Sequence, residues 1–255
     1  SGPGINDLNG DGKIDAADKD ERQNFANWYS YYRTRNYAAK AGVSRAFATL
    51  GSGIRIGYGR INKATADTVD GKSLSTIERG VRTFSGTDRK AFFDWLFGLQ
   101  PTAATPLRRA LDATGQYFEN DSSVGPWSTT PGTSGGTNLS CRHSYTILMT
   151  DGYWNDAEAA TAAARENVDG TAGPTVTAAD GKSSSYAAVS PFTDSYSNTL
   201  ADIAMYYWKR DLRTDMANRV PVSVLDLAFW QHMVTFGIGL GVEGAVDPDE
   251  AFASI

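Results

Sequence analysis

The sequence has little cysteine, no clusters of basic residues and no long apolar runs. Its one cysteine, Cys141, rules out a disulfide within the 255-residue chain, and we expect a partly buried, inert thiol. There are 24 Lys and Arg against 29 Asp and Glu, a net charge of −5 with no basic patch, which argues against a nucleic-acid partner. The longest apolar runs, 145–149 and 233–240, are shorter than the roughly 18 residues that span a bilayer, so we expect no membrane insertion.

The order of apolar and polar residues predicts an α/β fold. One apolar stripe from Phe25 to Leu50 predicts a long helix, with at least half of the aromatic rings between Trp28 and Tyr32 facing the core. Further helices are expected at 88–98, 106–118, 156–166 and 198–212, and strands at 54–58, 76–84, 145–149 and 233–240. The run 145–149 is typical of a central parallel strand that is covered on both faces. Strands and helices that alternate in this way predict a mostly parallel sheet flanked by helices.

Residues 7–18 have the pattern of an EF-hand-like or dockerin-like calcium loop. Calcium takes six to eight oxygen ligands, which such a loop supplies from positions 1, 3, 5, 7, 9 and 12, with glycine at position 6. Gly12 is at position 6 here. The ligand positions are occupied by Asp7, Asn9, Asp11, Lys13 through its carbonyl, Asp15 and Asp18. We expect Ca²⁺ in this loop, where it would fix the start of the following helix. The alternative is an acidic leader that binds no metal.

Six longer segments are distinctive: 24–35, 93–96, 105–108, 144–155 (Ser-Tyr-Thr-Ile-Leu-Met-Thr-Asp-Gly-Tyr-Trp-Asn), 194–202 and 229–236. Together they resemble the PilC/PilY family of type IV pilus tip-associated proteins. The resemblance implies a von Willebrand A-like domain over 21–255, after a lead-in with the calcium loop over 1–20. It also implies pilus biogenesis, twitching motility and surface attachment by a protein exported to the cell surface or pilus tip, although no leader is visible here. The implied partners are minor pilins or other pilus-tip proteins, and host or abiotic surface ligands.

The family resemblance also implies a divalent ion at the C-terminal edge of the sheet, where open α/β sheets bind ligands. Thr105 and Asp151 match two of the three loops that hold such an ion, which would be Mg²⁺. The third loop, Asp-x-Ser-x-Ser after a first strand, does not occur in this sequence. We therefore expect an incomplete site, with the first strand missing or supplied from elsewhere. The alternatives are a turn carboxylate for Asp151 and a helix N-cap before Pro106 for Thr105.

The residues favour a protein that is not an enzyme. Gly132-Thr-Ser134-Gly-Gly136 fits the hydrolase pattern Gly-x-Ser-x-Gly, but it lies in a Gly/Ser/Thr-rich loop without the strand and helix that the pattern needs. His143 and His232 have no cysteine or carboxylate partner at a recognised spacing, so we expect both to be structural. The alternative function is an ion-dependent von Willebrand A-type subunit of a chelatase-like or protein-processing complex.

Overall fold

The computed structural model describes residues 10, 12, 19–101, 104–155 and 157–241. The chain divides into two compact units, one with the residues up to Gly53 and Ser85–Pro101, the other with Ile54–Phe84 and the residues from 102 onward. The expected calcium ligands Asp7, Asn9, Asp11, Lys13, Asp15 and Asp18 lie outside the described residues. The calcium loop, and its boundary with a domain that begins at residue 21, therefore stay predictions.

The described residues of the first unit form the helices α1 (Lys19–Tyr32), α2 (Arg35–Ala48) and α3 (Gly86–Gly98). The single long helix expected from the apolar stripe is wrong, because the chain is extended at Thr34, with φ −126° and ψ 153°. The Thr34 hydroxyl accepts a hydrogen bond from the Tyr37 amide at 3.2 Å, so Thr34 caps a new helix. At the other end of the unit, Lys40 Nζ donates to the Phe97 carbonyl at 2.9 Å, which satisfies an orphan group at the end of α3.

The aromatic rings of α1 do not face a core. Phe25, Trp28, Tyr29, Tyr31 and Tyr32 are all exposed, which contradicts the expectation that at least half of the rings between Trp28 and Tyr32 would be buried. The rings pack on each other instead, with the centroids of Phe25 and Trp28 5.8 Å apart. The physical reason is the break at Thr34, because the apolar stripe no longer continues along one straight helix.

The second unit mixes strands with helices. Its strands are β1 (Arg55–Gly59), β2 (Asp67–Val69), β3 (Lys72–Leu74), β4 (Ile77–Thr83), β5 (Tyr145–Thr150), β6 (Val176–Thr177), β7 (Ser183–Ser184) and β8 (Val234–Gly239). Its helices are α4 (Leu107–Phe118), α5 (Leu200–Trp208) and the 3₁₀ turn η2 (Ala162–Arg165). The described strands form four two-stranded sheets, of which β5–β8 is parallel and the others are antiparallel. The mixture expected from the sequence is confirmed, whereas one large parallel sheet does not form within the described residues.

Two elements of the structure differ from those that the sequence predicts. The helix expected at 156–166 is reduced to η2, because the Asp112 carboxylate accepts hydrogen bonds from the Ala160 and Thr161 amides at 2.8 and 3.2 Å. Those amides are then bonded to a side chain of α4 rather than to helical carbonyls. The strand β5 is not covered on both faces, since Tyr145 and Ile147 are exposed. It pairs with β8 as its one partner in the described sheet.

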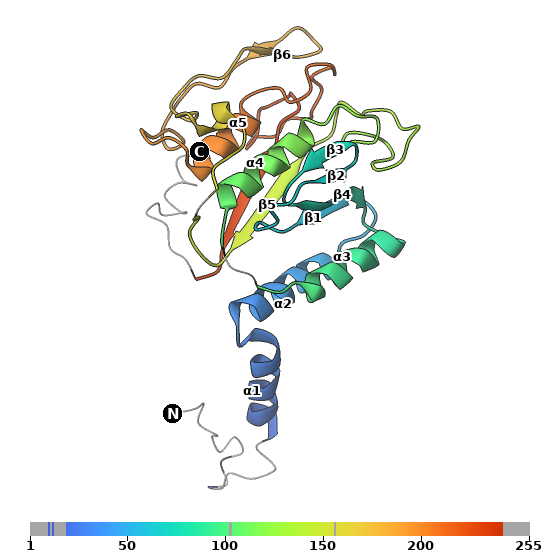
Figure 1. The fold of residues 1–255 in the computed structure, drawn as a ribbon, viewed down its shortest axis with the longest axis vertical. Coiled ribbons are helices and arrows are strands. Elements are labelled where there is room, and N and C mark those ends of the chain that lie inside the picture. The colour runs from blue at the N-terminus through green and yellow to red at the C-terminus, as the bar shows by residue number, and fades with distance from the viewer. Residues whose placement is uncertain (1–9, 11, 13–18, 102–103, 156, 242–255) are drawn as a thin grey trace. The chain divides into compact units, whose positions relative to one another are not determined.

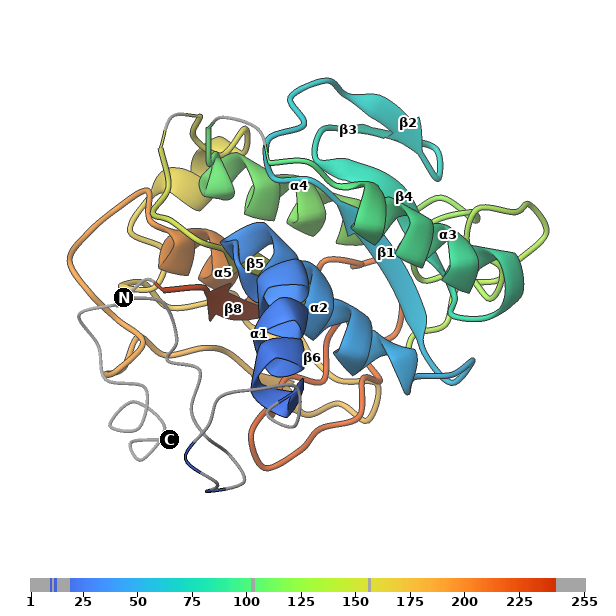
Figure 2. The same ribbon diagram turned by 90° about the horizontal axis from the view of Figure 1, so that it is seen from below.

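Helices α4 and α5 lie side by side (Figure 1), and the core of the second unit is formed by side chains from these helices, from β2, β3 and β4, and from the loops around them. Its buried apolar side chains include Leu74, Leu111, Trp127, Ile203, Tyr207 and Met233. Gly115 lets α4 approach α5, because a Cβ there would lie 2.4 Å from ring atoms of Tyr207. In Figure 2 the hairpin β2–β3 lies beside α4 and β4, and these elements are in contact. Cys141 is exposed at the surface, contrary to the partly buried thiol that we expected.

Among the described residues, no helix combines the length and apolar character needed to cross a membrane.

Candidate functional site

The candidate site lies where β5 and β8 end. These strands run parallel in register, with Thr150 opposite Gly239, and the Leu240 amide donates to the Thr150 carbonyl at 2.8 Å. Asp151 follows the last residue of β5 directly and is exposed. The Gly152 amide donates to Thr150 Oγ1 at 3.2 Å, which closes the turn around Asp151. Asp151 is therefore at the strand end where the sequence placed it, although the strand belongs to a two-stranded sheet.

Thr105 is tied to the same segment through the backbone. Its amide donates to Asn155 Oδ1 at 2.6 Å, and the Asn155 amide donates to the Thr105 carbonyl at 3.1 Å. This pair of bonds holds the start of α4 against the segment that follows β5. The alternative of Thr105 as a helix N-cap is wrong, because Pro106 is the N-cap residue and α4 has no side-chain cap bond. Sequence reasoning missed Asn155, since an isolated Asn carries no pattern.

No group of three or more His, Cys, Asp or Glu in the described part of the chain is arranged to hold a metal. Asp202 is buried in α5, where its carboxylate accepts from the Val168 amide at 2.7 Å and completes a capping box with Thr199. Metal binding by Thr105 and Asp151 stays a prediction.

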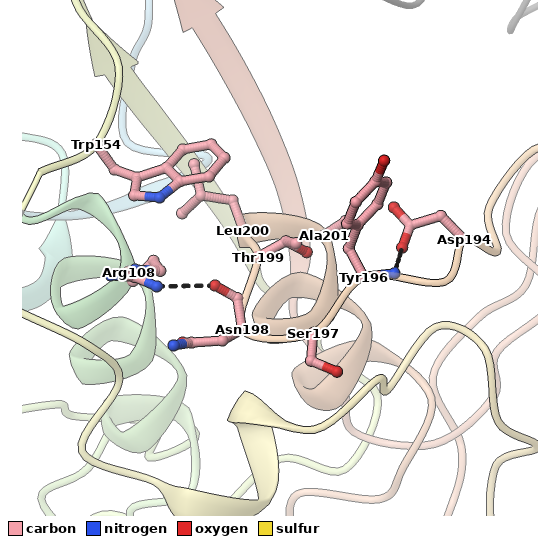
Figure 3. Close-up of a pocket in the computed structure, with 9 residues that line it drawn as sticks. All are labelled: Arg108, Trp154, Asp194, Tyr196, Ser197, Asn198, Thr199, Leu200 and Ala201. Atoms are coloured by element: carbon pink, nitrogen blue, oxygen red, sulfur yellow. Dashed lines mark hydrogen bonds between the residues drawn. The ribbon is translucent and has the colours of Figure 1, made fainter.

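A recess of about 650 Å³ opens beside the segment that follows β5 (Figure 3). It is lined by Arg108 from α4, by Trp154 after β5, by Asp194, Tyr196, Ser197, Asn198 and Thr199 before α5, and by Leu200 and Ala201 in the first turn of α5. Figure 3 shows Trp154 and Tyr196 on opposite sides of Thr199 and Leu200. Both rings are exposed, Trp154 by 42% and Tyr196 by 70% of their surface. We call this recess the Trp154–Tyr196 pocket.

The wall of the Trp154–Tyr196 pocket is fixed by hydrogen bonds. Asn198 has a left-handed backbone, with φ 61°, a conformation that Asn tolerates better than most residues. Its carbonyl accepts from Arg108 Nη1 at 3.0 Å, and its Nδ2 donates to Glu158 Oε1 at 2.8 Å. Thr199 then caps α5 and accepts from the Asp202 amide at 3.1 Å. These contacts hold the chain between α4 and α5 in one conformation.

The charges at the pocket nearly balance. Arg108 contributes one positive charge and Asp194 one negative charge to the lining. Hydrogen bonds from Arg165 and Asn198 lower the pKa of Glu158, so this neighbouring carboxyl is ionised at neutral pH and adds a negative charge close to Asn198. The pocket therefore has no excess of positive charge with which to attract an anion.

The two histidines make contacts within the fold. His143 Nε2 lies 2.8 Å from the Pro221 carbonyl. His232 is buried, with Nδ1 2.7 Å from the Trp230 carbonyl and Nε2 2.8 Å from Asp226 Oδ2. Sequence reasoning missed the carboxylate partner, because a six-residue separation matches no ligand pattern. Burial opposes ionisation of Asp226, but the hydrogen bond and charge of His232 outweigh it and lower the pKa of this carboxyl.

Comparison with known proteins shows similarity along most of the chain. The chain is 36% identical over 246 residues to the type IV pilus biogenesis factor PilY1 of Pseudomonas aeruginosa strain PAK. It is 32% identical over 237 residues to the protein of the same name from strain UCBPP-PA14. These matches cover 90% and 87% of this chain. Over this stretch the chain belongs to the PilC/PilY family.

The PilC/PilY assignment confirms the resemblance seen in the sequence. The chain spans about a fifth of the length of the curated relatives that it matches, namely 20% and 19%. No protein-family model and no solved structure matches the chain. The fold is therefore described by its own elements, and a von Willebrand A-like fold stays a prediction.

The Trp154–Tyr196 pocket is built from segments that carry the PilC/PilY resemblance. Its lining residues all come from 105–108, 144–155 and 194–202, three of the six distinctive segments of the sequence. These segments are far apart along the chain, so the sequence alone does not reveal that they meet. The sequence signal is that each of these segments carries the family resemblance, and the structure shows that they line one pocket.

Proposed function

We propose that this chain is a non-catalytic module of a surface protein that acts in type IV pilus biogenesis, twitching motility and surface attachment. The observation that supports this most is similarity to PilY1 proteins over 90% of the chain. The chain covers 20% of that relative, so we expect other parts of a full-length protein to contribute to these functions. The proposed location is extracellular, at the cell surface or pilus tip.

The proposed partners are minor pilins or other pilus-tip proteins on one side, and host or abiotic surfaces on the other. Exposed apolar side chains in both units suit protein contacts, since large apolar patches at a surface usually mark interaction sites. In the first unit these are the α1 rings, such as Trp28 and Tyr31. In the second they include Ile147, Phe236 and Ile238 on β5 and β8.

We further propose that calcium is the resident metal, bound by residues 7–18. The support is the ligand pattern of the sequence, in which five side-chain oxygens and one backbone carbonyl fall in register with Gly12. Mg²⁺ at the sheet edge is proposed only together with ligands from a further segment. Thr105 and Asp151 provide one neutral and one anionic oxygen, which are fewer ligands than the octahedral coordination of Mg²⁺ needs.

Calcium is expected to raise the melting temperature of the purified chain. A metal that binds the folded state alone adds about 2.7 kcal/mol at a hundredfold excess over its Kd. For a chain of this size that corresponds to an increase of about 5 °C or more. The measurement is thermal unfolding with calcium and with a chelator, for the wild type and for Asp11→Ala. Asp11→Ala should lose the increase, and Asp121→Ala, which removes an exposed carboxylate elsewhere, should keep it.

Elemental analysis after dialysis against both metals separates the two sites. We expect calcium to be retained by Asp151→Ala and lost by Asp11→Ala, with no magnesium held by either. An equal calcium response of Asp11→Ala and the wild type would contradict the calcium loop. Magnesium lost from Asp151→Ala but kept by Asp11→Ala would show that the sheet-edge site has a further ligand.

The test of the proposed function is an in-frame deletion of residues 54–241 from the gene in its own bacterium. We expect fewer surface pili and a smaller twitching zone, provided that immunoblots find the shortened protein at the cell surface. Normal piliation and twitching with normal export would contradict the proposal. The alternative, an ion-dependent subunit of a chelatase-like or protein-processing complex, predicts a protein that stays inside the cell and co-purifies with an ATPase.

A further inference from the structure

We propose that the Trp154–Tyr196 pocket binds a neutral saccharide, one pyranose residue of a surface glycan. This inference deepens the proposed attachment role and takes its biological meaning from it. The binding itself is a property of the purified chain, so it can be tested without pili.

The two exposed rings provide the apolar part of the proposed contact. Trp154 and Tyr196 lie on opposite sides of Thr199 and Leu200, so a small ligand above these residues meets a ring on each side (Figure 3). Neither ring packs against another aromatic side chain among the described residues. One face of a pyranose ring is covered with C–H groups, which carry a weak positive charge and pack well on the negative face of an aromatic ring.

Polar groups around the rings match the hydroxyl groups of a sugar. Asp194 Oδ1 accepts from the Tyr196 amide at 2.7 Å, and a carboxylate has further lone pairs that accept from hydroxyl donors. Ser197 adds an exposed hydroxyl that both donates and accepts. Arg108 adds a guanidinium donor, whose Nη1 is already fixed on the Asn198 carbonyl. Such a mixture of aromatic faces with a few oriented donors and acceptors is typical of small-molecule sites.

The balance of charge selects a neutral ligand over an acidic one. Asp194 lines the pocket and offsets the charge of Arg108, and Glu158, which is hydrogen-bonded to Asn198 in the pocket wall, forms an ion pair with Arg165. An acidic sugar or a phosphate would meet no net attraction here. A nucleotide is disfavoured for the same reason.

The pocket is arranged before any ligand arrives. Asn198 is held from both sides by Arg108 and Glu158, and Thr199 is held by the capping box of α5. The Asp194 amide also donates to Asp169 Oδ1 at 3.2 Å, which fixes the other end of the loop that carries Tyr196. The backbone of the pocket wall is therefore already ordered when a ligand binds, and little affinity is lost to ordering the loop.

The experiment is ligand-observed NMR titration of the purified chain with three probes. These are methyl β-D-galactopyranoside, methyl β-D-glucopyranoside and the methyl glycoside of N-acetylneuraminic acid as the acidic comparison. We expect at least one neutral probe to bind in the millimolar range, and the acidic probe to bind more weakly. Trp154→Ala and Tyr196→Ala should each weaken that binding by about tenfold, or about 1.4 kcal/mol. Trp154→Phe should keep most of it.

The matched control is Trp28→Ala, which removes another exposed tryptophan, on α1, and should bind as the wild type does. Melting temperatures confirm that each variant is folded. The inference is overturned if neither neutral probe binds, if the acidic probe binds best, or if both ring variants bind like the wild type. Because pili and twitching are counted separately in cells, a chain that binds sugar but is dispensable for pili overturns the proposed function alone. The converse result overturns the saccharide inference alone.

Discussion

Asp70→Asn is expected to lower the free energy of unfolding of the second unit by about 3–5 kcal/mol, because it removes the buried carboxylate that pairs with the largely buried Arg82. The side chain of Asp70 is 2% exposed and that of Arg82 is 17% exposed. The two form a bidentate pair, with Arg82 Nη1 and Nη2 at 3.0 and 2.5 Å from the carboxylate oxygens. Such a loss is large beside the roughly 5–15 kcal/mol of a typical domain.

The Asp70 carboxylate also organises its neighbours. The Tyr117 hydroxyl donates to it at 2.6 Å and accepts from the Val81 amide at 2.8 Å. Burial and the Asp70 carboxylate raise the pKa of Tyr117, which stays protonated as a donor. Gly80 makes room for the contact, since a Cβ there would lie 1.9 Å from Asp70 Oδ2. Asn at position 70 still tolerates the backbone φ of 50°, so the change tests the charge rather than the turn.

Urea unfolding followed by tryptophan fluorescence measures this effect, because Trp127 is buried in the core of this unit. Asp67→Asn is the control. It removes the partner of Lys63 at 3.0 Å, but the Asp67 side chain is 64% exposed, so the cost should be below about 0.5 kcal/mol. A loss of less than about 1 kcal/mol for Asp70→Asn would contradict the structural role of the pair.

The elements that the sequence predicted well depend on local pattern. Alternation of Ile54, Ile56 and Tyr58 predicted β1, and the apolar run 145–149 predicted β5. Between β2 and β3, Asp70 and Gly71 both take the positive φ that a tight hairpin turn requires. Local pattern does not predict the ion pair of Asp70, because its partner Arg82 lies on another strand.

The predictions that failed were overruled by contacts between distant residues or by capping. The apolar stripe from Phe25 to Leu50 looked continuous, yet Thr34 offered its hydroxyl as a cap and divided the helix. The Ala-rich stretch after Asp156 has high helix propensity, but the Asp112 carboxylate withdrew two of its amides. Propensity is worth a few tenths of a kcal/mol per residue, which a buried charged hydrogen bond exceeds.

The candidate site was likewise predicted only in part. The sequence predicted that Thr105 and Asp151 lie at the same end of β5. The two backbone hydrogen bonds between Thr105 and Asn155 show that Thr105 is bonded to the segment after that strand. The Trp154–Tyr196 pocket was not predicted, because Trp154 and Tyr196 are separated by polar loops and line one recess only together with residues of α4 and α5. Aromatic residues in loops have no periodicity from which their neighbours can be inferred.

Asp112→Leu is expected to lower the free energy of unfolding by about 4 kcal/mol or more. Asp112 is 1% exposed and joins three segments of the second unit. Its Oδ2 accepts from Gln116 Nε2 and from the amides of Ala160 and Thr161, and its Oδ1 accepts from the Tyr207 hydroxyl at 2.7 Å. Leucine fills a similar volume but accepts nothing, so several buried donors would be left unsatisfied at about 1–3 kcal/mol each.

Asp112→Asn separates the loss of hydrogen bonds from the loss of charge. The amide oxygen can still face the Ala160 and Thr161 amides, while its NH₂ group turns to Tyr207. Burial and the Asp112 carboxylate raise the pKa of Tyr207, so this hydroxyl keeps its proton, and it can accept from an amide while donating to Thr161 Oγ1, 3.1 Å away. We therefore expect Asp112→Asn to cost about 1–2 kcal/mol in urea unfolding.

Amide hydrogen exchange gives the second readout: protection of Ala160 and Thr161 should be lost in Asp112→Leu and kept in Asp112→Asn. Protection of both amides that persists in Asp112→Leu would mean that the carboxylate does not hold this segment on α4.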